Sequence, residues 1–218
     1  MGPPGAGKGT QAEALARDTG SAHLATGDIL RQALREETAL GLEAKRFMDA
    51  GALVPDRVVL GLVEERLDGL GPDTGFVLDG FPRTVPQAEG LDRMLERLAR
   101  PLEAVLLLGV SDDVVVARLA GRRTCADCGA VYAAEGRPVR VEDDRCGQCG
   151  GRLGVRTDDR PETVRRRLEV YRSETEPVVA HYAAQGLVRR VEAQGSVEAV
   201  RGRLLAALAP TEGLGASR

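Results

Sequence analysis

The stretch Gly2-Pro-Pro-Gly-Ala-Gly-Lys-Gly-Thr10 opens the chain, and a helical pattern begins directly after it at Gln11. Its glycines allow successive backbone N–H groups to converge on an anion, and the positive end of the following helix adds to that attraction. Lys8 has the spacing of the lysine that reaches the outer phosphates in loops of the type G-x-x-x-x-G-K. The stretch therefore predicts a phosphate-binding loop; the alternative is a glycine-rich turn before an exposed helix. The residues expected to bind phosphate are Gly5, Ala6, Gly7, Lys8, Gly9 and Thr10.

A loop of this kind follows a buried strand, and only Met1 precedes Gly2 in this sequence. One residue cannot form a central strand. We therefore expect either that the start is misplaced, with about 5–7 further apolar residues belonging in front of Met1, or that the loop is weakly anchored.

Short apolar runs alternate with helical patterns along the rest of the chain. Continuous apolar runs, as opposed to strict alternation, are typical of parallel strands covered by helices on both faces, so we predict an α/β fold. The expected strands are residues 23–25, 75–78, 104–110 and 187–191, and the expected helices are residues 11–17, 57–67, 86–98, 112–120, 162–184 and 197–208. Residues 27–55 are helical without a strand, and the tail 210–218 has no periodicity, so we expect the tail to be disordered.

The composition excludes several classes of protein. The 218 residues are 43% hydrophobic with a formal net charge of −3, which excludes a disordered chain and argues against a nucleic-acid binder. The longest apolar run, residues 104–110, is far shorter than a membrane span. No basic and apolar leader follows Met1, so we expect a soluble cytoplasmic protein. All but two of the 30 basic residues are arginine, which makes Lys8 stand out.

Four cysteines form two close pairs, Cys125-x-x-Cys128 and Cys146-x-x-Cys149, separated by seventeen residues. This spacing predicts a zinc site, and four thiolates would close the coordination shell, so the metal would be structural. The alternatives are two disulfides, which a reducing compartment disfavours, and a zinc ribbon that binds nucleic acid, which the acidic run Glu142–Asp144 disfavours.

With these motifs, the chain resembles the adenylate kinases, in their bacterial form with a zinc-bearing lid, over essentially its whole length. The runs that carry the resemblance are Gly2–Thr10, Thr26–Arg31, Leu78–Thr84, Gly121–Arg123, Asp158–Asp159 and Glu162–Arg167. The resemblance implies one P-loop core over residues 1–218, a parallel sheet flanked by helices, with a helical AMP-binding insert at 25–55 and a zinc-stapled lid at 122–159. It also implies reversible phosphoryl transfer from MgATP to AMP, giving two ADP, by a monomer that binds neither nucleic acid nor membranes.

The catalytic residues that the resemblance implies are Lys8, Asp28, Asp79, Arg83, Arg118, Arg122, Arg156 and Arg167. Their chemistry is consistent with this role. Asp79 ends an apolar run, at the edge of the sheet where ligands bind, and a carboxylate there can hold the water shell of Mg²⁺; the alternative is a helix cap. Asp28 has the same alternative. The arginines would stabilise the charge that spreads over a transferring phosphoryl group, while Arg165 and Arg166 are expected to be solvated.

The resemblance also assigns the two nucleotide pockets. The residues expected around AMP are Thr26, Arg31, Ala52, Leu53, Val54, Gly80, Phe81, Pro82, Arg83, Gln87, Arg156 and Arg167, and those around the adenine of ATP are Arg122, Val131, Tyr132 and Gly195. An amide can pair at two points with an adenine edge, which gives Gln87 a chemical reason; the alternative for Gln87 is an exposed helix position. His23 and His181 are expected to be structural or solvent-facing.

Two other functions remain open from the sequence. One is another nucleoside-monophosphate kinase with GMP, UMP or CMP as the acceptor. The other is a protein that binds nucleotides but is inactive because the first strand is missing.

Overall fold

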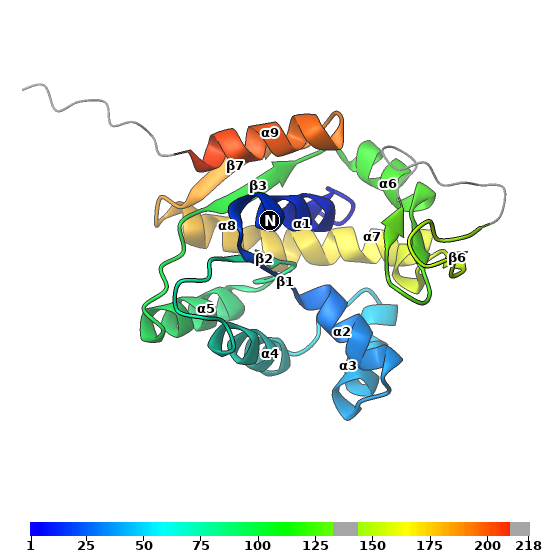
Figure 1. The fold of residues 1–218 in the computed structure, drawn as a ribbon, viewed down its shortest axis with the longest axis horizontal. Helices are drawn as coiled ribbons and strands as arrows, with labels where there is room; N and C mark the ends of the chain where they lie inside the picture. Colours follow the sequence, from blue (N-terminus) through cyan, green and yellow to red (C-terminus); the bar gives the residue numbers. More distant parts are fainter. Residues whose placement is uncertain (133–143, 210–218) are drawn as a thin grey trace, which may run out of the picture.

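The computed structural model describes residues 1–132 and 144–209. The expected disordered tail 210–218 and the acidic residues Glu142 and Asp143 lie outside the described residues. Within the described part, two pairs of parallel strands form the centre of the molecule (Figure 1). Strand β1 (Ala22–Ala25) pairs with β2 (Phe76–Asp79), and β3 (Val105–Gly109) pairs with β7 (Val188–Glu192). The predicted parallel α/β fold is confirmed, and each predicted strand lies within one or two residues of an observed one.

Helices cover the strands on both faces. Helices α1 (Lys8–Thr19) and α9 (Val197–Leu208) pack together on one side, with α1 against β1 and β2 and α9 against β7. Helices α4 (Asp56–Asp68), α5 (Val85–Arg97) and α8 (Glu176–Ala183) lie toward the other side (Figure 1). Leu91 of α5 and Val63 of α4 share a core cluster, and Leu204 of α9 shares another with Val191 of β7. The buried apolar faces fix the strands, and the strands place their carboxyl ends at one edge.

The helical stretch predicted for residues 162–184 consists of three segments. Helix α7 (Pro161–Val170) continues into a π-helical turn, Tyr171–Thr175, and then into α8. Pro177 lies in the first turn of α8, where its missing N–H removes one bond of the ladder, and a wider turn accommodates this. The turn has a consequence for the site, because the Thr175 hydroxyl donates to the backbone carbonyl of Arg83 at 2.9 Å.

Two peripheral parts depart from the alternation of strands and helices. Helices α2 (Thr26–Arg35) and α3 (Ala39–Asp49) pack on each other after β1. After α6 (Asp112–Gly121), the strands β4 (Arg123–Cys125), β5 (Val131–Tyr132) and β6 (Leu153–Gly154) form a small antiparallel sheet, followed by a short 3₁₀ turn, Thr157–Asp159. No helix in residues 1–132 and 144–209 has the length and apolarity needed to cross a membrane.

Candidate phosphoryl-transfer site

The glycine-rich loop leads directly into α1. Gly7 caps the helix with φ of 88°, a left-handed conformation that glycine adopts without strain, and Lys8 is the first helical residue. The Lys8 ammonium donates to the carbonyl oxygens of Gly2 and Pro3, both at 2.8 Å. Burial lowers the pKa of Lys8 to about 7, and the nearby Asp79 opposes this. The loop thus presents a buried cation at the amino end of a helix, which favours an anionic ligand.

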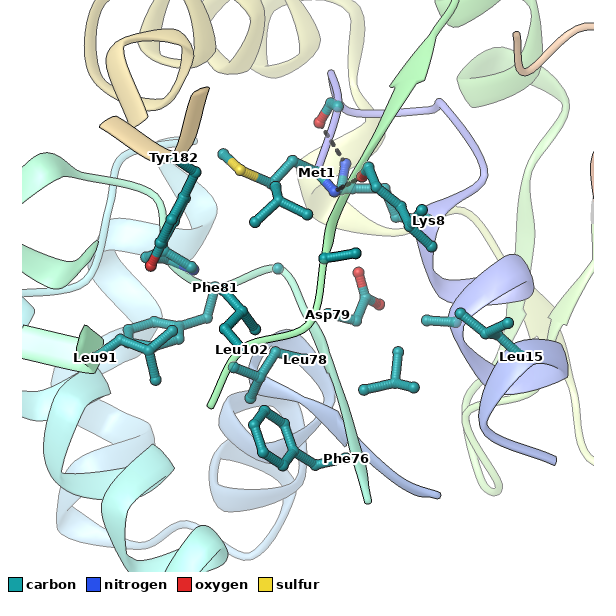
Figure 2. Close-up of a pocket in the computed structure, with 18 of the residues that line it drawn as sticks. Met1, Lys8, Leu15, Phe76, Leu78, Asp79, Phe81, Leu91, Leu102 and Tyr182 are labelled. Atoms are coloured by element: carbon teal, nitrogen blue, oxygen red, sulfur yellow. Dashed lines mark hydrogen bonds between the residues drawn. The ribbon is translucent and has the colours of Figure 1, made fainter. Parts of the chain in front are cut away.

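Asp79 lies at the carboxyl end of β2, beside the loop. A methyl group on Gly9 would lie 3.3 Å from the Asp79 Oδ2 atom, so the absence of a side chain at Gly9 allows this approach. Figure 2 shows Asp79 and Lys8 lining the same cavity. His23 of β1 is half-buried, with its Nε2 3.9 Å from Asp79 Oδ2 and without a hydrogen-bond partner in the described residues. Of the two interpretations predicted for His23, the solvent-facing one is wrong, because its Nε2 atom is buried and only 23% of the side chain is exposed.

A second, smaller cavity of about 80 Å³ lies between α2, the end of α3 and the segment after β2. Its lining includes Thr26, Arg31, Ala52, Leu53, Val54, Gly80, Arg83, Gln87 and Arg167, most of the residues expected around AMP. Phe81 has its ring in the apolar core, and Pro82 follows it through a cis peptide bond. Arg83 and Arg167 line both this cavity and the cavity of Lys8 and Asp79. These two guanidinium groups therefore connect the two cavities.

Buried polar side chains fix the wall of the smaller cavity. The Thr26 hydroxyl donates to the Gly80 carbonyl at 3.1 Å. Gln87 is 1% exposed, and its Oε1 accepts from the Arg83 backbone N–H at 2.8 Å while its Nε2 donates to Asp56 at 2.7 Å. The alternative of an exposed helix position for Gln87 is therefore wrong. Its amide keeps one N–H and one lone pair that these two bonds do not use.

Three of the expected arginines meet on two adjacent carboxylates. Arg122 contacts both oxygens of Asp159, with Nε to Oδ2 at 2.6 Å, and the Asp159 side chain is fully buried. Arg156 binds both oxygens of Asp158 at 3.0 and 3.2 Å. Arg167 reaches both aspartates, at 3.1 Å to Asp158 and 3.3 Å to Asp159. Although burial opposes it, the neighbouring arginines hold the pKa of Asp158 below its usual range. The two aspartates thus hold three cations together.

Burial is also the main cause of the shifted pKa values of the guanidinium groups. It lowers the pKa of Arg83 and of Arg156 to about 10, and neighbouring arginines add to the effect. Such desolvated, mutually repelling cations gain most when a polyanion enters between them.

The remaining expected residues lie outside this cluster. Arg118 donates to the Ala193 carbonyl at 3.0 Å, in the segment between β7 and α9 that also holds Gly195. Asp28 is largely exposed and forms an ion pair with Arg31. The alternative that Asp28 caps the helix is wrong, since α2 begins at Thr26 and its N-cap is Ala25.

The four cysteines lie together in the small antiparallel sheet. Their sulfur atoms are all within 4.8 Å of one another, with 3.5 Å between Cys125 and Cys149 and 3.5 Å between Cys128 and Cys146. None is in a disulfide. A tetrahedral zinc with bonds of about 2.3 Å requires sulfur separations of about 3.8 Å, so the four residues fit this metal. The Tyr132 hydroxyl, 3.2 Å from Cys146 Sγ, lowers the pKa of that thiol to about 6.

Comparison with known proteins agrees with this geometry. The family model for adenylate kinase matches residues 1–187. The chain is 50% identical over 208 residues to the adenylate kinase of Syntrophotalea carbinolica, covering 95% of this chain and 96% of that protein. It is 51% identical over 208 residues to that of Acidothermus cellulolyticus, covering 95% of each chain. The chain belongs to the adenylate kinase family. The adenylate kinase of Archaeoglobus fulgidus is also similar, with 48% identity over 200 residues and 92% of each chain covered.

Membership of the adenylate kinase family shows that the chain is a phosphotransferase. Sequence reasoning noted Asp158 and Asp159 as a motif but gave them no role, and it did not consider Asp56 or Thr175. Their partners are distant in sequence, and only a fold that joins them reveals the contacts: Asp56 with Gln87, and Thr175 with Arg83. Tyr132 is buried against the cysteines, so its side chain supports the cluster of four thiols.

Proposed function

We propose that this adenylate kinase family member transfers the γ-phosphoryl group of MgATP to AMP, reversibly, giving two ADP. The observation that carries the proposal is that Arg83 and Arg167 line both cavities. A phosphoryl group passing from a donor held by the glycine-rich loop to an acceptor in the smaller cavity would lie between these two side chains. Transfer between two nucleotides requires such a shared set of cations.

The position of each residue in the site gives it a separate role in the reaction. The N–H groups of residues 5–10 and the Lys8 ammonium bind the outer phosphates of ATP. Arg83, Arg122, Arg156 and Arg167 stabilise the charge that spreads over the transferring group, and no covalent intermediate is needed. Asp79 holds the water shell of Mg²⁺, and the bound ion neutralises charge on the phosphates. Asp28, exposed and paired with Arg31, contributes through that arginine, while Arg118 acts from the side of Gly195.

The smaller cavity accepts AMP. Thr26 and Gln87 face the base, with the backbone of Ala52–Val54 beside it, and Gly80, Phe81 and Pro82 aim Arg83 toward the phosphate. Val131, Tyr132 and Gly195 contribute backbone contacts to the adenine of ATP, beside Arg122. The free N–H and lone pair of the Gln87 amide match the donor and acceptor of an adenine edge.

Two inserts in one core close over the substrates, residues 25–55 over AMP and residues 122–159 over ATP. One structural zinc holds the second insert together and is bound by Cys125, Cys128, Cys146 and Cys149. Closure excludes water, which would otherwise accept the phosphoryl group. Four free thiols arranged for a metal suit a reducing compartment, so we infer that the enzyme acts in the cytoplasm. We also propose that it acts as a monomer.

Turnover of ATP and AMP with Mg²⁺ tests the proposal. We expect ADP to form, and we expect Arg167→Lys to lower kcat by about 10²–10³, the usual cost of one transition-state donor. Arg165→Lys on the same helix is the matched control, because Arg165 is exposed, as expected. Equal rates for the two variants would contradict the role of Arg167. Nucleotide binding with no ADP formed would contradict the reaction itself.

The choice of acceptor is tested by comparing AMP with GMP, CMP and UMP. If the phosphoryl group is transferred faster to GMP, CMP or UMP than to AMP, the enzyme catalyses the same reaction with a different nucleoside monophosphate as its acceptor.

A further inference from the structure

One long helical segment is connected to both of the arginines that the two cavities share. Helix α7, the π-helical turn and α8 follow one another directly along the chain (Figure 1). Arg167 lies on α7 and lines both cavities. At the last position of the π-helical turn, the Thr175 hydroxyl donates to the backbone carbonyl of Arg83 at 2.9 Å. The segment therefore carries one of the two arginines and binds the backbone of the other.

The π-helical turn decides which side of the helix Thr175 faces. The Glu176 N–H donates to the carbonyl of Tyr171, five residues back in place of four, so the turn holds one extra residue. At about 100° per residue, an unbroken α-helix would place Thr175 about 80° away from Arg167. Because the wide turn absorbs one residue, the two side chains differ by only about 20°. Thr175 therefore faces the same side of the helix as Arg167.

The exposure of the neighbouring residues agrees with this extra residue. In an unbroken α-helix, position 174 would share the face of Arg167, because seven residues make about two turns. Residues 172–174 are exposed, however, and Thr175 is buried. Arg167, Tyr171 and Thr175 line the larger of the two cavities. The π-helical turn thus places a hydroxyl group on the cavity side of the helix, where Glu174 would otherwise lie.

Arg83 is held by three hydrogen bonds. Its backbone N–H donates to Gln87 at 2.8 Å, and its Nε donates to the Gly80 carbonyl at 2.7 Å. Both partners are within four residues of Arg83, so these two bonds fix the shape of the loop between β2 and α5 and move with it. The bond from Thr175 is the long-range one, and it joins this loop to the helical segment that carries Arg167. It alone of the three sets one arginine relative to the other.

We propose that Thr175 is a positioning residue for phosphoryl transfer, whose hydroxyl fixes Arg83 relative to Arg167 so that both guanidinium groups face the same transferring group. This role rests on the proposed function, which gives the two arginines a shared task. Burial and repulsion by Arg167 both lower the pKa of Arg83, so the two cations oppose close approach until a polyanion enters. Thr175 binds the backbone carbonyl, which leaves the Nη groups of Arg83 available to a phosphate.

Two substitutions of Thr175 separate its hydroxyl from its shape and test the proposal. Thr175→Val keeps the shape and removes the donor, whereas Thr175→Ser keeps the donor. We expect Thr175→Val to lower kcat for ADP formation by on the order of 10-fold, less than a misplacement of about 1 Å can cost, because the other two bonds of Arg83 remain. Thr175→Ser should retain most of the parent kcat. The KM for ATP should change little in both variants, since the glycine-rich loop is undisturbed.

Three further measurements separate positioning from a purely structural role. In an Arg83→Ala background, Thr175→Val should lower kcat no further, because the guanidinium group that Thr175 positions is gone. Exchange of the Arg83 Nε–H, followed by NMR, should be faster in Thr175→Val than in the parent and in Thr175→Ser, as the bond to Gly80 loosens. Val178→Ala, which removes buried apolar contacts of α8, should lower the Tm and leave kcat near that of the parent.

Several results would overturn the role of Thr175. One is an active parent whose kcat Thr175→Val does not change, and another is an equal loss of kcat in Thr175→Ser. The same holds if Thr175→Val has its full effect in the Arg83→Ala background, or if Val178→Ala lowers kcat as much as Thr175→Val does. A parent that forms no ADP would instead contradict the proposed function, and the exchange of the Arg83 Nε–H would still show whether Thr175 holds this arginine in place.

Discussion

Replacing Asp159 with asparagine removes the carboxylate that Arg122 and Arg167 share at the base of the cysteine-containing insert. The Asp159 side chain is fully buried and Arg122 is 17% exposed, so water does little to compensate either guanidinium group for the loss. The asparagine oxygen accepts from one arginine, but its NH₂ group then faces the other, where it repels an N–H donor.

The structure allows the magnitude to be estimated. Removing one partner of a buried ion pair costs about 3–5 kcal/mol, and we expect the lower end because Asp158 still pairs with Arg167. For a chain of this size, about 3 kcal/mol corresponds to a fall in Tm of about 6–12 °C. Activity should fall as well, since Arg122 loses the group that orients it.

Thermal unfolding followed by circular dichroism measures the effect. The matched control is Glu169→Gln, which neutralises an exposed carboxylate paired with Arg166 on α7, where both side chains are at least 60% exposed. Such a pair contributes at most about 0.5 kcal/mol, so the control should unfold within about 2 °C of the parent. Equal Tm values for Asp159→Asn and Glu169→Gln would refute the argument that the buried network stabilises the fold.

Three further predictions concern the pH response, the metal and the acceptor pocket. Between the lowered pKa of Lys8, about 7, and its ordinary value of 10.5, the folded protein without nucleotide binds fewer protons than the unfolded chain, so the contribution of Lys8 to the free energy of unfolding should rise with pH across that window. Denaturant titrations at several pH values should show that the free energy of unfolding changes with pH differently in the parent and in Lys8→Met within this window, and equally outside it. The same pH dependence of both proteins within the window would contradict the prediction. Metal analysis should find about one zinc per chain. Cys146→Ser or strong chelation should remove the zinc and lower the Tm, because four thiolates are needed to close the site. If the zinc is removed and the Tm does not change, the prediction is contradicted. Gln87→Leu should destabilise the fold by about 1–3 kcal/mol, because the Arg83 N–H and Asp56 lose their buried partner. The same variant should raise the KM for AMP more than the KM for ATP. Equal increases in both KM values would contradict the assignment of Gln87 to the acceptor pocket.

Local signals in the sequence already determine much of this protein. The glycine-rich loop and Lys8 predict a phosphate site, because turn geometry and a helix start depend on neighbouring residues alone. The apolar runs identify the parallel strands because burial on both faces requires continuous apolar residues. The spacing of the four cysteines predicts the cluster of four thiols that the structure shows, since each close pair forms its own turn.

Only the tertiary structure decided which distant residues meet. Arg122 and Asp159 are 37 positions apart, and Gln87 and Asp56 are 31 apart, and no periodicity links them. The sequence raised two alternatives for the single residue before the loop but could not say how Met1 is bound. In the fold, Met1 binds the backbone of β3 and lines the same cavity as Lys8 and Asp79. Such contacts depend on how helices and strands pack in three dimensions, which patterns along the chain do not encode.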